Sequence, residues 1–213
     1  MPQEAQYALL ELFRDGGIMM YFLVLASLLA LGVIIAKGYM LFVAHRDSQE
    51  LLGQLDTLRE TGAGIDRAIE VADGTQGPVA AILSTGLRRM REKQSGRDIE
   101  RAVSTIGAIE LGFLEQGLVV LATVANVAPM MGFLGTVAGM ISAFGAVAEA
   151  GQIEASLVAA GIKVALITTA AGLTIAIPVN IAYNFFVTRI DMLIMDMERG
   201  AQAMLDLGAR VGR

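Results

Sequence analysis

The sequence contains no cysteine, and His45 is the only histidine among its 213 residues. The absence of cysteine excludes disulfides, thiolate metal sites and cysteine nucleophiles. A single histidine excludes a histidine-based metal or catalytic cluster within one chain. No paired nucleophile and base and no phosphate-binding loop is visible, so we expect neither an enzyme nor a bound cofactor. The formal net charge of -5 leaves no basic stripe for a phosphate backbone, and we expect no nucleic-acid partner.

Charged residues are also scarce, at 17% of the chain against 55% hydrophobic residues. A soluble protein of this length would need a very large core to bury so much apolar surface, so a membrane protein is the simpler interpretation. Three runs carry no charge: residues 16–36, 116–148 and 164–188. As helices these runs would be about 32, 50 and 37 Å long, compared with a hydrocarbon layer of about 30 Å.

The second run is too long for one bilayer. The apolar pattern of Ile99, Val103 and Ile106 leads directly into this run, which favours a second membrane helix that extends into the aqueous phase. The alternative is a kink at Pro129, with the excess apolar surface buried against protein. The sequence leaves both alternatives open.

The predicted fold is an all-α membrane protein with three transmembrane helices and a cytoplasmic helical domain. Its predicted segments are a periplasmic amphipathic segment at 1–15, transmembrane helix 1 at 16–43, the cytoplasmic helical domain at 44–115, transmembrane helix 2 at 116–148, a periplasmic hairpin at 149–160, transmembrane helix 3 at 161–188 and a cytoplasmic C-terminal helix at 189–213. Residues 1–15 lack the basic region of a secretory signal, so we expect the first apolar run to be retained.

The distribution of lysine and arginine predicts the orientation of these segments. Nine such residues lie in the loop from 46 to 101 and four follow residue 188, whereas none lies in 149–160. Cytoplasmic loops are enriched in these residues, so we place the loop and the C-terminus in the cytoplasm and the N-terminus in the periplasm. Lys37 can extend its ammonium to the interface. We interpret the basic run from Arg88 to Lys93 as a solvated helix face near anionic lipid.

Polar side chains within the apolar runs are few, and lipid offers them no hydrogen-bond partner. On the third run a small and polar stripe at helical spacing comprises Thr169, Gly172, Ala176, Asn180, Tyr183 and Asn184. We expect this stripe to face protein or water rather than lipid. On the second run, three glycines surround Thr136 at helical spacing: Gly132, Gly135 and Gly139. Packing explains both features as well, because threonine can donate to its own helix and glycines can admit a neighbouring helix.

Two dense motifs lie in the second and third runs. The first reads Ala128-Pro129, then Gly132-Phe133-Leu134-Gly135-Thr136-Val137-Ala138-Gly139-Met140; the second reads Ala165-Leu166-Ile167-Thr168-Thr169-Ala170-Ala171-Gly172-Leu173, then Ala176-Ile177-Pro178. Together with the three-helix layout, they resemble the ExbB/TolQ/MotA proton-channel family, most closely its ExbB and TolQ branch. One departure is Val164, which stands where members of that branch often have a glutamate. The adjacent Lys163 is interpreted as a charge that reaches the interface at the helix end.

The resemblance implies a homopentamer in the bacterial inner membrane, with its second and third helices around an ExbD- or TolR-like single-span protein. That partner would carry the protonatable aspartate, and a TonB- or TolA-like periplasm-spanning protein is a further expected partner. By matching positions, Thr136 and Thr169 are the proton-pathway residues. The residues expected to line the pore or pack helices are Gly132, Gly135, Gly139, Gly172, Ala176, Asn180 and Asn184.

The function expected from this resemblance is that of a subunit in a motor driven by the proton-motive force. Such a motor couples proton flow to work on outer-membrane or envelope machinery, including active import. The alternative is a non-conducting membrane ring scaffold that anchors a partner protein, with the threonines serving only to pack helices.

Overall fold

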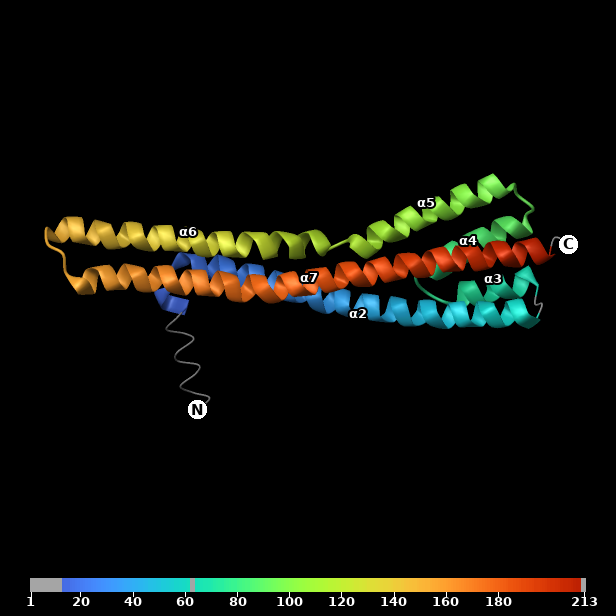
Figure 1. Ribbon diagram of the computed structural model, residues 1–213, viewed down its shortest axis with the longest axis horizontal. Coiled ribbons are helices and arrows are strands. Elements are labelled where there is room, and N and C mark those ends of the chain that lie inside the picture. Colours follow the sequence, from blue (N-terminus) through green and yellow to red (C-terminus); the bar gives the residue numbers. More distant parts are fainter. Residues whose placement is uncertain (1–12, 62–63, 212–213) are drawn as a thin grey trace, which may run out of the picture. The chain divides into compact units, whose positions relative to one another are not determined.

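The computed structural model describes residues 13–61 and 64–211. Over these two ranges the regular secondary structure is helical, without a strand, which confirms the predicted all-α fold. The predicted amphipathic segment at 1–15 lies outside the described residues except for its last three positions. Helix labels in the text follow Figure 1.

Three stretches among the described residues are long and apolar enough to cross a membrane: Ile18–Leu58, Gly96–Ala150 and Ala155–Asp206. The first lies within α2 (Ile18–Thr61), the second comprises α5 (Gly96–Glu115) and α6 (Leu118–Ala150), and the third lies within α7 (Ala155–Val211). Many large apolar side chains on these helices are exposed, such as Phe22 at 52% and Phe133 at 68%. Such surfaces suit lipid or a neighbouring protein, and the chain is a membrane protein.

The chain divides into two compact units. The apolar unit comprises the residues up to Ile35 together with Gly117–Asn184. The charged unit comprises Ala36–Gln116 and Phe185–Arg213. Both α2 and α7 pass from one unit into the other without interruption.

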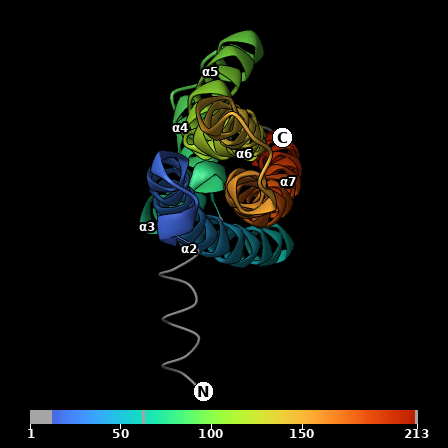
Figure 2. The same ribbon diagram turned by 90° about the vertical axis from the view of Figure 1, so that its left-hand side faces the viewer.

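In the apolar unit α6 and the first part of α7 lie side by side, as both views show (Figures 1 and 2). Their connection is short because α6 ends at Ala150 and α7 begins at Ala155. Gly151 caps α6 in the left-handed conformation, with φ 67°, and its amide bonds to the oxygen of Val147 at 3.1 Å. Glycine adopts this conformation at little cost, which explains why the helix stops there.

In the charged unit α4 (Pro78–Arg91) packs on α3 (Ile65–Gly74) and on α5. Apolar residues recur at three- and four-residue intervals on these helices, and their side chains form the core. This core includes Leu51, Leu55, Ile69, Val79, Ile82, Leu83, Leu87, Leu193 and Met197. Glycine allows close approach at one point, because a Cβ atom on Gly86 would lie 2.1 Å from the sulfur of Met204.

Charged side chains connect the helices of this unit. Arg88 pairs with Asp73 at 2.6 Å and Arg91 pairs with Asp66 at 3.5 Å, so part of the predicted basic run serves to join α4 to α3. Asp196 of α7 is 3% exposed and accepts a hydrogen bond from Gln49 of α2 at 2.9 Å. A buried carboxylate requires such partners because its desolvation is costly.

The apolar pattern predicted a helix running from Ile99 into the second apolar run, and the structure interrupts that helix. Helix α5 ends at Glu115 and α6 begins at Leu118. Gln116 is extended, with φ -55° and ψ 129°, and Gly117 is left-handed, with φ 88°. The interruption therefore lies at the first two residues of the apolar run, and α6 itself continues through Pro129.

We predict that Leu83→Ala lowers the stability of the charged unit. The side chain of Leu83 is fully buried, and truncating a buried leucine typically costs about 2–5 kcal/mol. The measurement is the loss of helical circular dichroism on heating the purified protein in detergent. Leu205→Ala is the matched control, because Leu205 is 52% exposed and its truncation should change the midpoint little. Equal shifts for the two variants would contradict the assignment of this core.

Candidate functional site in the apolar unit

Helices α6 and α7 contact each other backbone to backbone along a line that includes Gly139 and Gly172, which we call the seam. A Cβ atom on Gly172 would lie 2.6 Å from the backbone oxygen of Ala128. A Cβ atom on Gly139 would lie 2.7 Å from the backbone oxygen of Gly161. Real Cβ atoms do not approach other atoms this closely, so only glycine fits at these positions. Membrane helices pack in this way because small residues allow close approach where lipid provides no hydrophobic driving force.

Between these two contacts, Thr168 fills the space left by Gly135. Thr168 is 1% exposed, and a Cβ atom on Gly135 would lie 2.4 Å from its hydroxyl oxygen. The hydroxyl lies 3.0 Å from the oxygen of Ala165 and donates within its own helix. Thr168 is therefore a packing residue of the seam, with its polar atom satisfied by the backbone.

Thr169 is the predicted proton-pathway residue, and no role was predicted for the adjacent Thr168. The spacing of small residues is the sequence signal that marks Thr168. Small residues recur at intervals of four, three and four positions along this face of α7: Gly161, Ala165, Thr168 and Gly172. Each of these four residues is buried.

Thr169 lies at the edge of the seam. Its side chain is half-buried, with the hydroxyl oxygen 3.3 Å from the backbone oxygen of Gly132 on α6 and 3.2 Å from that of Ala165 on α7. A hydroxyl has one hydrogen, so Thr169 donates to one of these carbonyls at a time. Its lone pairs stay available to accept a hydrogen bond from another group.

Thr136 lies one helical turn along α6 from Gly132, the residue whose carbonyl faces Thr169. Thr136 is half-buried and donates to the backbone oxygen of Phe133 at 2.6 Å. The structure therefore brings both predicted proton-pathway residues to the same stretch of the seam. Both keep acceptor capacity on their hydroxyls, and neither is fully buried.

The predicted polar stripe on α7 does not form one surface. Gly172 and Ala176 are buried, whereas Asn180 and Asn184 are exposed. The Nδ2 atom of Asn184 donates to the backbone oxygen of Asn180 at 2.9 Å. Amides exposed on a membrane helix need water or protein beside them, because lipid cannot bond to them.

The apolar stretches at 118–148 and 164–188 contain no ionisable aspartate, glutamate, histidine, lysine or arginine. At the edge of this unit Lys163 pairs with Asp15 at 2.5 Å. Lys163, which the sequence suggested as a charge that reaches the interface at the helix end, contacts a carboxylate that precedes α2. Across the described residues no group of three histidine, cysteine or acidic side chains could hold a metal ion. The seam can exchange hydrogen bonds, but it cannot store a proton on its own side chains.

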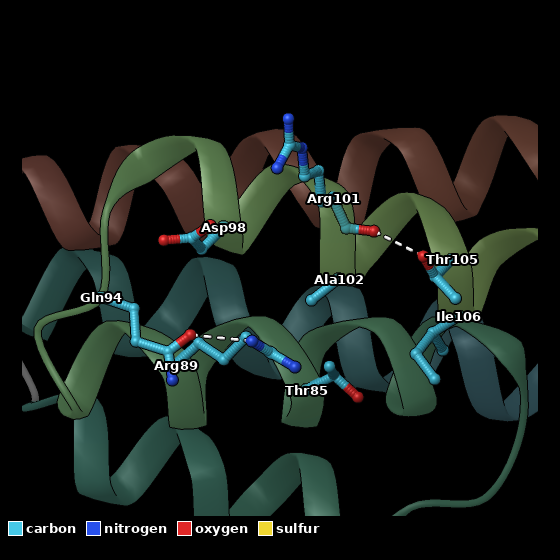
Figure 3. Close-up of a pocket in the computed structure, with 8 residues that line it drawn as sticks. All are labelled: Thr85, Arg89, Gln94, Asp98, Arg101, Ala102, Thr105 and Ile106. Carbon is cyan, nitrogen blue, oxygen red and sulfur yellow. Dashed lines mark hydrogen bonds between the residues drawn. The ribbon is translucent and has the colours of Figure 1, made fainter.

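A groove of about 360 Å³ lies between α4 and α5 in the charged unit. Figure 3 shows Ala102 and Ile106 directed toward α4 and the guanidinium of Arg101 directed away from it. Arg89 donates to the Oε1 atom of Gln94 at 2.8 Å. The charged groups of this groove do not converge on one point, so it lacks the arrangement expected of a catalytic or ion-binding site.

The seam lies within the part of the chain that matches the model of a known protein family. The model of the MotA/TolQ/ExbB proton channel family matches residues 75–199. The chain is 32% identical over 184 residues to the biopolymer transport protein ExbB of Pseudomonas putida, which covers 81% of this chain and 54% of that protein. It is 30% identical over 208 residues to the Tol-Pal system protein TolQ of Haemophilus influenzae, which covers 90% of each chain.

A shorter match concerns the biopolymer transport protein ExbB of Aquifex aeolicus. It is 40% identical over 85 residues, covering 40% of this chain and 57% of that protein. The chain thus spans a little more than half the length of the two ExbB proteins it matches.

We predict that Gly172→Ala destabilises the pairing of α6 and α7. The added methyl group would meet the backbone oxygen of Ala128, which cannot move aside as a flexible side chain can. The expected result is a lower midpoint for thermal unfolding of the purified protein in detergent. Gly145→Ala is the matched control, because a Cβ atom there has nothing within 4 Å and alanine favours helix by about 1 kcal/mol. A midpoint unchanged by Gly172→Ala would refute the tight seam.

Proposed function

The chain belongs to the MotA/TolQ/ExbB proton channel family, and we propose that it is an ExbB/TolQ-like subunit of an inner-membrane motor driven by the proton-motive force. It forms a homopentameric ring around an ExbD- or TolR-like single-span protein. The ring couples proton flow to work on outer-membrane or envelope machinery, such as active import. A TonB- or TolA-like protein that spans the periplasm receives this work.

One observation carries the proposal: the seam presents two hydroxyls and no carboxylate. Thr136 and Thr169 lie half-buried on adjacent helices, and the apolar stretches around them contain no aspartate, glutamate, histidine, lysine or arginine. A proton that crosses the membrane needs a titratable carrier, so the partner supplies the aspartate and this chain supplies hydrogen bonds to it. Each proton moved across 100 mV releases about 2.3 kcal/mol, so a few transfers can drive a conformational step.

The exposed surface of the apolar unit supports a ring around a partner. Asn180 and Asn184 are exposed between apolar residues, and a pore that holds another protein and water would accommodate these polar side chains better than lipid. In this assembly Gly132, Gly135, Gly139, Gly172 and Ala176 hold α6 against α7.

We place the charged unit in the cytoplasm and residues 151–154, which join α6 to α7, in the periplasm. The excess of lysine and arginine in the 46–101 loop supports this orientation. The N-terminus is then periplasmic and the C-terminus cytoplasmic. The pair of Lys163 and Asp15 lies at the periplasmic end of the apolar unit and fixes the start of α2 to α7.

A second candidate function is a ring scaffold that anchors a partner without conducting protons. The hydrogen bond from Thr169 to the carbonyl of Gly132 favours it, because this contact can serve to pack α6 on α7. Loss of proton flux on removal of the hydroxyl, with assembly intact, distinguishes conduction from packing.

We predict that Thr169→Val reduces proton flux about tenfold or more, since a positioned proton-transfer group typically contributes at least that factor. Valine keeps the shape of threonine but cannot exchange hydrogen bonds. The measurement is proton uptake into vesicles that contain the chain and its partner, driven by an imposed potential. Thr136→Val should act in the same direction, and Thr169→Ser should retain most of the flux.

Thr174→Val is the matched control on the same helix. Thr174 is exposed on α7 and donates to the oxygen of Ala170 at 2.7 Å, outside the seam. Its replacement should leave the flux near that of the wild type. Full flux in a Thr169→Val complex that assembles normally would support the scaffold instead.

We further predict a ring of five chains when the purified complex is imaged as single particles. A ring with another number of chains would count against the ExbB/TolQ assignment. Dissociation into single chains in every detergent would count against any ring.

A further inference from the structure

Lys37 lies in an unusual place for a lysine next to an apolar helix. The residue is only 6% exposed, and its ammonium donates to the backbone oxygen of Leu114 at 2.9 Å and to that of Phe113 at 3.2 Å. A third contact is the sulfur of Met40 at 3.7 Å. All of these residues belong to the charged unit. The ammonium is therefore bound at the end of α5 instead of extending into interfacial water.

The two carbonyls are the ones that a continuous helix would use at this point. In an α-helix the amide of each residue donates to the oxygen four positions earlier. The oxygen of Phe113 would then accept from Gly117, and the oxygen of Leu114 would accept from Leu118. In the structure Lys37 takes the place of both amides. A cation is also favoured there by the negative end of the helix dipole.

The backbone between α5 and α6 is compatible with either arrangement. The hydrogen bond from the amide of Gln116 to the oxygen of Gly112 closes α5, and the amide of Val120 bonds to the oxygen of Gly117 as α6 starts. Gly117 has φ 88°, a conformation that glycine adopts freely, but glycine also adopts the helical conformation. No proline stands at the interruption, and the apolar pattern of α5 continues toward α6. The sequence thus permits one long helix.

We propose that Lys37 is a latch that sets whether α5 and α6 are two helices or one. With its ammonium on the oxygens of Phe113 and Leu114, the amides of residues 117 and 118 have no helical acceptors and the chain breaks at Gly117. When the ammonium leaves, these amides bond to the freed oxygens and the two helices join. The same two acceptors cannot serve both sets of donors fully, so the two states exclude each other.

The role of this latch in transport rests on the proposed function. Residues 116 and 117 are a covalent link between the apolar unit, which contains the seam, and the charged unit. An interrupted link acts as a joint, whereas a continuous helix is stiff. The latch would therefore set how strongly movement at the seam is passed to the charged unit.

Hydrogen exchange tests the latch directly, without any measurement of transport. The full chain in lipid nanodiscs is placed in deuterated buffer, and exchange at the amide of Leu118 is resolved by fragmentation mass spectrometry. Lys37→Met removes the ammonium and keeps an unbranched side chain, so we expect at least tenfold slower exchange at this amide. Lys37→Arg is the matched control, because arginine keeps the cation and its donors and should exchange as the wild type does.

Gly117→Ala provides an independent variant that leaves the lysine intact. Alanine is disfavoured at φ 88°, so this change should also join the helices and slow exchange at Leu118. Slower exchange in both variants supports the latch. Unchanged or faster exchange in either variant overturns it, because Lys37 would then only cap α5. A chain that passes this test and conducts no protons would refute the proposed function and leave the latch standing.

Discussion

Direct contact between the backbones of α6 and α7 is the constraint on which the apolar unit depends. At Gly172 and Gly139 an added Cβ atom would meet a backbone oxygen of the other helix at 2.6 and 2.7 Å. This approach lets Thr168 fill the space at Gly135 and leaves Thr169 at the edge of the seam, within reach of a carbonyl on each helix. If the helices were farther apart, Thr169 could not contact both carbonyls. The glycines are thus the reason that a hydroxyl is presented at a defined place in an apolar layer.

The chemistry of the seam is limited by what its side chains can ionise. A threonine hydroxyl donates one hydrogen bond and accepts others, but it does not titrate in the physiological range. The charged groups of the chain gather instead in the charged unit and at the end of the apolar unit, where Asp15 meets Lys163. Under the proposed function, the chain guides a proton with hydroxyls and obtains the titrating group from its partner. In that proposal packing and transport depend on the same few residues, because the contacts that close the seam also position Thr169.

The sequence predicted the helical class and the apolar stretches well, because the scarcity of charge over long runs depends on local composition alone. The predicted hairpin at 149–160 contains the end of α6 at Gly151, since glycine adopts the left-handed conformation at little cost. Two features could not be predicted in this way. The interruption at Gly117 involves Lys37, which lies far away in the sequence and is brought there by tertiary packing. The spacing of small residues marks the face of α7 that contains Thr168, but the contact of Thr168 with Gly135 is defined only when α6 is in place.

The chain passes between the apolar and charged units three times. Helices α2 and α7 make two of these connections without interruption, whereas the connection at residues 116 and 117 is not helical. An unbroken helix transmits torsion along its axis, since its hydrogen-bonded turns resist unwinding. A short non-helical link absorbs torsion by rotation about a few backbone bonds. Two of the three connections between the units are therefore continuous helices, and the third is a short non-helical link. Along α7 the helical connection leads from Thr169, through Pro178, to Asp196, which accepts a hydrogen bond from Gln49 of α2, whereas α5 and α6 share no continuous helix.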